Sequence, residues 1–257
     1  MTALIRPLTT IMRSRSLLRS TKELIRKSLT ASGSNWLHLM VRRAQGQNLD
    51  HLRGETTSER FQYIYRQGTW LSGDRLGSLS GIGSAISATQ KLRDELPSIL
   101  SSLKTQRLLD VGCGDFGWLK EVDLPCEYVG IDIVPDIVVL NLERYSRPGR
   151  LFLSLDATTC PLPRADTILC REVLFHLSFR DIRKLIGNVI RSGARFLLAT
   201  NDEGLRFNSD ILSGDFRLLN LEKEPFFFPK PLLVTPDDAV NPDRVISVWD
   251  VSRLLDE

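Results

Sequence analysis

With 257 residues, the chain is long enough for one sizeable α/β domain and an appendage. Hydrophobic residues make up 42% and charged residues 25%, as in an ordinary soluble protein, and no apolar run of about 18 residues predicts a transmembrane helix. The net charge of +3 comes from residues 1–51, because the remainder is mildly acidic, and this balance argues against a nucleic-acid substrate.

The cysteines give no sign of a metal site. Cys113, Cys126, Cys160 and Cys170 form no C-x-x-C pair and have no histidine at a zinc-binding spacing. We expect free thiols in a reducing compartment and no bound metal. Because the N-terminus lacks the short apolar core of a secretory signal, we expect a cytoplasmic protein.

Residues 1–58 are expected to form a basic N-terminal arm that is helical or partly disordered. Leu18, Ile25 and Leu29 fall on one helical face among Arg and Lys side chains, which indicates a basic amphipathic tendency. Three interpretations stay open: a solvated tail, a helix lying on an anionic membrane surface or a partner, and an organelle-targeting presequence. Peripheral membrane contact through the arm is therefore one of its open roles.

Residues 59–104 are expected to be a helical lead-in to a domain that spans 59–257. A Ser-Gly-Ile-Gly-Ser turn at 80–84 precedes a helix that Ser84 or Ser87 could cap and that Pro97 is expected to bend or restart. The turn is either a simple loop or a lid over a bound ligand, with Trp70 packing nearby.

The chain then alternates between strands and helices, which is the pattern of a parallel sheet. Helices are expected to begin near Phe116 and to cover 135–145 and 181–191. Apolar runs predict strands at 107–111, 127–133, 150–157, 167–173, 195–202 and 244–251. The fold class is therefore α/β.

A glycine turn follows the first of these strands. Asp110 stands near the end of that strand, Gly112, Gly114 and Gly117 form the turn, and Asp132 ends the second strand. Glycines let backbone amides approach a ligand, and an acid at the second strand end can accept hydrogen bonds from a ribose diol. The arrangement predicts a pocket for a nucleotide-like cofactor.

The charges near the turn indicate which cofactor this is. G-x-G-x-x-G also occurs in dinucleotide-binding folds, where a helix N-terminus faces a pyrophosphate, and Asp110 and Asp115 would repel that group. Two carboxylates favour a cationic ligand without phosphate. S-adenosylmethionine is such a ligand, because it carries a sulfonium and an ammonium group.

These motifs resemble the class I S-adenosylmethionine-dependent methyltransferases, whose first motif ends a strand with acid-x-Gly-x-Gly. The resemblance runs from about residue 63 to 254 and is to a bacterial group of unassigned substrate. Gly117 departs from the commonest form, because it is displaced by one position. The resemblance implies a Rossmann-like, seven-stranded, mostly parallel sheet with helices on both faces, an antiparallel edge pair and a helical N-terminal extension.

The resemblance also implies a set of cofactor-binding residues. Asp132, with Ile133 beside it, would bind the ribose hydroxyls, and Asp156 with Ala157 would border the adenine. The backbone at Gly112 and Gly114 would lie along the methionine portion, and Asp110 would face the same cavity. Asp132 and Asp156 could instead be simple strand-end caps.

Three neighbouring residues are candidates for catalysis. His176 could act as a base on an acceptor hydroxyl or only shape the floor of the site. Glu172 stands four positions before it, so the two share a helix face if a helix has begun there. Arg171 could bind an anionic group of the acceptor or pair with Glu172 or Asp202.

The acceptor is left open by these motifs. Residues 206–232 are expected to supply acceptor contacts, and residues 226–228, three phenylalanines, either line an acceptor pocket or anchor the loop. We expect O-methylation of a small molecule or a saccharide. The alternative is a non-catalytic S-adenosylmethionine-binding adaptor that is recruited through its basic arm.

Overall fold

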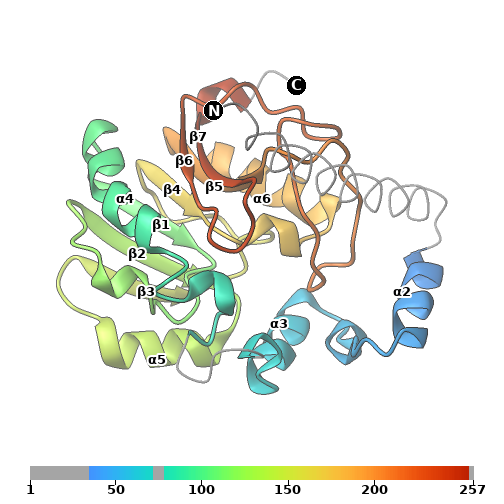
Figure 1. Cartoon of the computed structure of the whole chain (residues 1–257). Coiled ribbons are helices and arrows are strands. Elements are labelled where there is room, and N and C mark those ends of the chain that lie inside the picture. The colour runs from blue at the N-terminus through green and yellow to red at the C-terminus, as the bar shows by residue number, and fades with distance from the viewer. Residues whose placement is uncertain (1–34, 72–77, 255–257) are drawn as a thin grey trace, which may run out of the picture.

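The computed structural model describes residues 35–71 and 78–254, and its centre is a seven-stranded sheet with the order β3-β2-β1-β4-β5-β7-β6 (Figure 1). The first five strands pair in parallel, whereas β7 runs antiparallel to β5 and β6. The strands are β1 (Arg107–Val111), β2 (Glu127–Asp132), β3 (Arg150–Ser154), β4 (Thr167–Cys170), β5 (Phe196–Asp202), β6 (Leu233–Pro236) and β7 (Arg244–Asp250). The expected sheet and its antiparallel edge pair are confirmed.

Five α-helices are described: α2 (Asn35–Ala44), α3 (Thr57–Arg66), α4 (Gln90–Ser102), α5 (Pro135–Tyr145) and α6 (Phe179–Ser192). Single turns of 3-10 helix lie at Ile82–Ser84, Leu119–Glu121 and Leu174–His176, among other places. None of the helices within residues 35–71 and 78–254 is long and apolar enough to span a bilayer.

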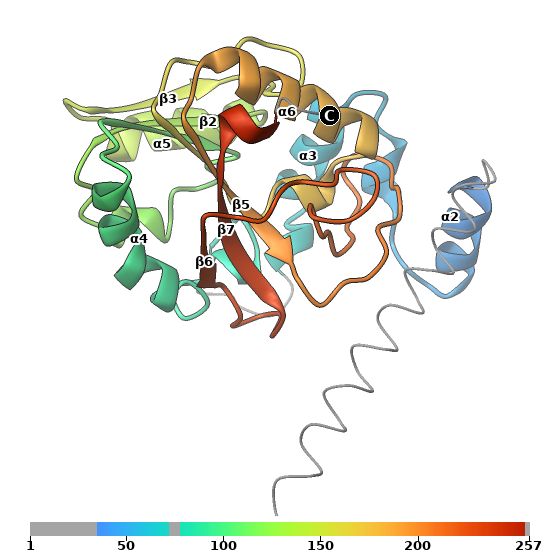
Figure 2. The ribbon, with the colours of Figure 1, turned by 90° about the horizontal axis from the view of Figure 1, so that it is seen from above.

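The helices cover both faces of the sheet, as Figure 2 shows from above. Leu96 and Leu100 of α4 pack in one apolar cluster with Leu108 of β1. Ile64 of α3 and Leu185 of α6 pack in a second cluster on the opposite face. Because successive strand residues point to opposite faces, neighbouring side chains of β1 enter different clusters.

No α-helix lies between β1 and β2, so the prediction of a helix beginning near Phe116 is wrong. The connection to β2 contains only the single 3-10 turn Leu119–Glu121. Phe116 has a φ of +55°, which lies outside the helical region, and its ring is fully buried against Tyr128 and Phe152. The apolar residues of this connection fill the core as a compact loop.

The helix before β1 also begins later than expected. Thr89 precedes α4 in place of Ser84 or Ser87, and Ser84 ends a 3-10 turn. Pro97 lies inside α4, which continues through it to Ser102. The region from 85 to 89 therefore belongs to the loop that leads away from the Ser-Gly-Ile-Gly-Ser turn.

Part of the N-terminal region packs on the domain. Leu49 and Leu52 are buried, and Arg42 of α2 forms an ion pair with Asp215. Thr56 caps α3 in a reciprocal capping box with Glu59. The amphipathic stretch around residues 18–29 lies outside the described residues.

Candidate active site

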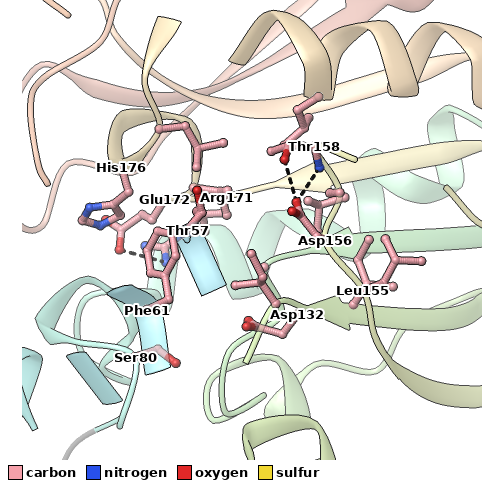
Figure 3. Close-up of a pocket in the computed structure, with 18 of the residues that line it drawn as sticks. Thr57, Phe61, Ser80, Asp132, Leu155, Asp156, Thr158, Arg171, Glu172 and His176 are labelled. Carbon is pink, nitrogen blue, oxygen red and sulfur yellow. Dashed lines mark hydrogen bonds and ion pairs between the residues drawn. The ribbon is translucent and has the colours of Figure 1, made fainter. Parts of the chain in front are cut away.

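A cleft opens at the carboxyl ends of the parallel strands, where α3 covers it. It encloses about 790 Å³ of empty space, including its mouth, which is within the size range of small-molecule sites. Strand ends and the loops after them supply Gly112, Asp132, Ile133, Asp156, Ala157 and Glu172, and Figure 3 shows several of these side chains around the cavity. A pocket is therefore present at the strand ends where the sequence predicted one.

Asp132 lines this cleft and also caps the end of β2. Its Oδ2 accepts a hydrogen bond from the Gly114 amide at 3.0 Å, and its Oδ1 accepts one from the Val134 amide at 2.9 Å. Burial raises the pKa of Asp132, while the amide hydrogen bonds act in the opposite direction. Because each carboxylate oxygen has two lone pairs, both oxygens can accept a further bond from a ribose hydroxyl.

Asp110 lies behind the wall of the cleft instead of lining it, contrary to our expectation. Strand alternation turns its side chain to the face that holds Tyr128, whose hydroxyl donates a 2.7 Å hydrogen bond to Asp110 Oδ2. Burial raises the pKa of Asp110 to about 7. Its carboxylate therefore belongs to the core beneath the glycine turn.

Both glycines of the turn are required by close contacts. A Cβ on Gly112, at φ +72°, would lie 2.4 Å from Val173 Cγ2, and one on Gly114, at φ +53°, would lie 2.2 Å from Ser80 Oγ. Gly112 borders the cleft directly. Gly114 acts on the cleft through the hydrogen bond that its amide donates to Asp132.

Asp156 and Ala157 lie at the other end of the cleft, beyond β3. Asp156 Oδ1 accepts hydrogen bonds from the Thr158 amide at 2.8 Å and the Thr158 hydroxyl at 2.7 Å. The Ala157 carbonyl accepts a 2.7 Å bond from Asn188 Nδ2 on α6. These contacts fix the backbone of the loop that forms this wall.

The guanidinium of Arg171 is hydrogen-bonded to other groups of the protein. Its Nε and Nη2 donate to the two carboxylate oxygens of Asp237 at 3.0 and 2.9 Å, and Nη2 also donates to the Gly83 carbonyl at 2.8 Å. Burial acts to lower the pKa of Arg171, but the carboxylates of Glu172 and Asp237 outweigh it and raise the pKa. The arginine thus ties the 80–84 turn to the edge of the sheet.

Glu172 stands between two arginines at the side of the cleft. Arg244 Nη1 donates to Glu172 Oε1 at 2.7 Å, and Arg171 Nη1 lies 3.7 Å from Oε2. Arg244, and not Arg171, pairs with Asp202. Glu172 has a φ of +57° and α6 begins only at Phe179, so the condition for a helix face shared with His176 is not met.

His176 is enclosed by aromatic rings. The ring centroids of Phe175 and Trp70 lie 4.7 and 5.2 Å from its imidazole, and those of Phe216 and Phe61 lie 5.7 and 6.2 Å away. Its Nδ1 lies 2.8 Å from the Asp215 carbonyl oxygen. A carbonyl only accepts, so Nδ1 carries the proton and Nε2 presents a lone pair. Burial lowers the pKa of His176 to about 4, so the ring is neutral at neutral pH.

Sequence reasoning missed the contribution of α3, whose Thr57, Phe61 and Tyr65 line the cleft. The capping signal Thr56-x-x-Glu59 marks where this helix begins, but nothing local to it indicates contact with β2. The Ser58 hydroxyl donates to the Ile133 carbonyl at 3.2 Å, a contact across 75 positions of sequence.

The 78–84 segment, here called the clasp segment, is fastened to the glycine turn. The Ser78 hydroxyl and the Leu79 amide donate to the Asp115 carboxylate, and the Asp115 amide donates to Ser80 Oγ at 3.0 Å. Tyr65 and Ser80 share a hydrogen bond of 3.0 Å between their hydroxyls. The clasp segment thus forms one side of the cleft, and its role as a lid stays a prediction.

A second cleft adjoins the first on the side of the clasp segment. Both clefts are lined by Trp70, Ser80, Glu172 and His176. Residues 206–232 contribute Phe216 and Leu218 to the second cleft. The two clefts therefore share a wall.

The three phenylalanines at 226–228 lie away from both clefts. Phe226 packs edge-on against Phe179 at 5.2 Å, and Phe228 packs against Trp249 at 5.3 Å. Phe226 and Phe228 therefore anchor the loop, as one of our two interpretations held, whereas Phe227 is exposed. In the part of the chain that the structure describes, no group of three or more His, Cys, Asp or Glu side chains could hold a metal ion.

Comparison with known proteins gives one family match. Residues 109–198 match a family model described as a methyltransferase domain. A search of the curated proteins found no match.

Solved methyltransferase structures resemble the chain at low sequence identity. The N-methyltransferase NodS from Bradyrhizobium japonicum, in complex with S-adenosyl-L-homocysteine, is 20% identical over 55% of this chain and 74% of its own, with a TM-score of 0.41. Human N-acetylserotonin methyltransferase, in complex with S-adenosylmethionine, is 20% identical over 68% of this chain and 50% of its own, with a TM-score of 0.41. An amino pentose methyltransferase from Micromonospora echinaspora is 21% identical over 42% of this chain and 48% of its own, with a TM-score of 0.35.

The residues present fit the cofactor that the resemblance implied. Gly112 leaves open the place where a Cβ would stand against Val173, and Asp132 offers lone pairs at the cleft wall. Neither feature calls for a phosphate group in the ligand. Residues 109–198 thus match a methyltransferase domain, and the sheet order around them is that of the Rossmann-like methyltransferase fold.

Proposed function

We propose that the enzyme methylates a hydroxyl group of a small-molecule acceptor across the wall that its two clefts share. The observation that carries this proposal is the pair of adjoining clefts with Trp70, Ser80, Glu172 and His176 in common. A donor in the first cleft and an acceptor in the second would meet at this wall. Bringing two reactants together in this way accounts for much of the acceleration that such a transfer needs.

The first cleft would hold the cofactor along its length. Asp132 accepts hydrogen bonds from the ribose hydroxyls, and Ile133 packs beside it. Asp156 and Ala157 border the adenine, and the backbone at Gly112 lies along the methionine portion. Gly114 and Asp110 support this wall from behind, through Asp132 and Tyr128.

When bound, the cofactor supplies a sulfonium methyl group, whose transfer breaks the carbon–sulfur bond and leaves a neutral thioether. The acceptor hydroxyl donates a hydrogen bond to Nε2 of His176. As its oxygen bonds to the methyl carbon, the hydroxyl proton passes to Nε2. A pKa near 4 makes His176 a weak base, so its main contribution is to orient the acceptor.

Glu172 and Arg171 have different parts in this proposal. Glu172 forms the shared wall, and Arg244 fixes its carboxylate. Arg171 is a positioning residue, because its guanidinium holds the Gly83 carbonyl and Asp237 instead of facing a ligand alone.

Calorimetric titration with S-adenosylhomocysteine tests the cofactor assignment. Asp132→Ala should weaken binding by about tenfold or more, because two hydrogen bonds to a charged group are lost. Asp136→Ala is the matched control, since this acid lies on α5 with 62% of its side chain exposed and should leave binding unchanged. Tight binding of NAD in place of S-adenosylhomocysteine would overturn the proposal.

Because Arg171 and Glu172 are held by Asp237 and Arg244, the second candidate is a non-catalytic S-adenosylmethionine-binding adaptor recruited through its basic arm. Binding of the cofactor cannot separate the two candidates. Transfer of a labelled methyl group into a cell extract, lost in Asp132→Ala, supports the enzyme. Binding without any labelled product across extracts supports the adaptor.

A further inference from the structure

The second cleft has a mouth of exposed apolar side chains. Ile82 is 53% exposed, Phe216 47% and Val240 44%, and all three line this cleft. They come from the clasp segment, from the 206–232 region and from the connection between β6 and β7. Exposed apolar side chains gathered at one opening favour contact with an apolar ligand.

Aromatic rings continue from this mouth into the same cleft. Phe216 packs edge-on against Phe175 at 5.2 Å between ring centroids, and Trp70 lies beside the imidazole of His176. All four residues line the second cleft. Their ring faces and edges favour a flat ring as a partner.

The polar groups of the cleft are largely bonded within the protein. Arg244 binds Glu172 and Asp202, and Asn241 Nδ2 donates to Asp202 Oδ1 at 2.6 Å. Ser80 Oγ is held by Tyr65 and the Asp115 amide. A ligand with many hydroxyl groups would lose hydrogen bonds to water here and regain few, which is costly.

We propose that the second cleft selects an apolar, ring-bearing acceptor, such as a phenol, in preference to a saccharide. This inference rests on the proposed function, because it names the substrate class for the same shared wall. The ring of the acceptor would lie between Phe216, Phe175 and Ile82. Its hydroxyl would reach Nε2 of His176.

Direct binding of two probes tests the inference. 2-Naphthol and methyl α-D-glucopyranoside are titrated into the protein, saturated with S-adenosylhomocysteine, and binding is followed by calorimetry and ligand-observed NMR. We expect saturable binding of 2-naphthol and none of the glucoside. Phe216→Ser and Ile82→Ser should each weaken 2-naphthol binding by about tenfold, since each removes buried apolar contact.

Phe227→Ser is the matched control. This phenylalanine is 55% exposed but lies in the groove beside α6, away from both clefts, so its removal should leave 2-naphthol binding unchanged. Both test positions are exposed, so the variants should fold, and S-adenosylhomocysteine binding by each variant verifies this.

The outcomes separate the two claims. If S-adenosylhomocysteine binds but 2-naphthol does not, if its binding is indifferent to Phe216→Ser, or if the glucoside binds more tightly, the substrate class is wrong. If S-adenosylhomocysteine fails to bind the unchanged protein, the proposed function is wrong. In that case, titration of 2-naphthol and the glucoside without S-adenosylhomocysteine tests whether the second cleft prefers the apolar ring.

Discussion

Arg171 donates two hydrogen bonds to the Asp237 carboxylate, from Nε to Oδ2 at 3.0 Å and from Nη2 to Oδ1 at 2.9 Å. Both side chains are almost fully buried, and 66 positions of sequence separate them. The pair joins the carboxyl end of β4 to the connection between β6 and β7. Through Gly83 it also holds the clasp segment, so it links the sheet edge to both clefts.

Removing one partner of this pair should be strongly destabilising. Asp237→Asn removes the countercharge that is hydrogen-bonded to the buried guanidinium and leaves only Glu172, 3.7 Å away, so we expect the free energy of unfolding to fall by about 3 kcal/mol. Asp238→Asn is an adjacent control, because its ion pair with Lys91 is exposed and should contribute less than about 1 kcal/mol. Urea unfolding of both variants measures the difference. Equal, small losses would show that the buried pair contributes little.

Gly83 should tolerate no side chain. A Cβ there would lie 1.9 Å from Glu172 Oε2, and that carboxylate is held in place by Arg244. We expect Gly83→Ala to displace the clasp segment and to lower methyl transfer by about tenfold or more, because misplacing the reacting groups by about 1 Å has a large effect.

Gly187→Ala serves as the comparison for Gly83→Ala. Its nearest neighbour would be the flexible end of Arg191 at 3.2 Å, and alanine favours the helix at this position in α6. Its activity should stay at the level of the unchanged protein. Full activity in Gly83→Ala would show that Glu172 can move without consequence.

The two buried groups His176 and Asp110 should impose opposite pH dependences on stability. The pKa of His176 falls from 6.5 to about 4 on folding, because burial disfavours the imidazolium. Its contribution is present above pH 6.5 and is lost as the pH falls, by about 2 kcal/mol between pH 7 and pH 5. The pKa of Asp110 rises from 3.8 to about 7, so its contribution is lost as the pH rises, by about 2 kcal/mol over the same interval.

Urea unfolding at both pH values of His176→Gln, Asp110→Asn and the unchanged protein separates these effects. His176→Gln should lose stability as the pH rises, relative to the unchanged protein, and Asp110→Asn should gain it. Parallel pH profiles for all three proteins would contradict both assignments.

Asp115 should control how firmly the clasp segment is closed. Its carboxylate accepts hydrogen bonds from Ser78 and Leu79, and Asp115→Ala removes them all. We expect faster amide hydrogen exchange at Leu79 and Ser80 and faster dissociation of S-adenosylhomocysteine. Asp123→Ala, an exposed acid in the same connection, should change neither quantity. Unchanged exchange at Leu79 in Asp115→Ala would show that other contacts close the segment.

The sequence predicted the sheet well because its signals are local. The apolar run at 107–111 and the helix at 135–145 coincide with β1 and α5. The helix expected near Phe116 failed because that connection has three glycines and buries its rings in the core. Asp132 could be placed from its position at a strand end.

The remaining parts of the site depend on contacts between distant segments. Ser58 reaches Ile133, and Arg171 reaches Asp237. Strand alternation alone could have predicted that the side chain of Asp110 lies on the face of the sheet that holds Tyr128. The ion pair of Arg171 with Glu172 was predicted, but its buried partner Asp237 was not, because several acids follow Arg171 in the chain and only packing selects one.

Ser80 borders both clefts, and its hydroxyl also joins Tyr65 to the glycine turn. A molecule in the second cleft therefore lies against the same segment that forms one side of the first cleft. We expect turnover to follow a compulsory order, in which the donor enters first and the demethylated donor leaves last. Steady-state inhibition by S-adenosylhomocysteine would then be competitive against the donor alone.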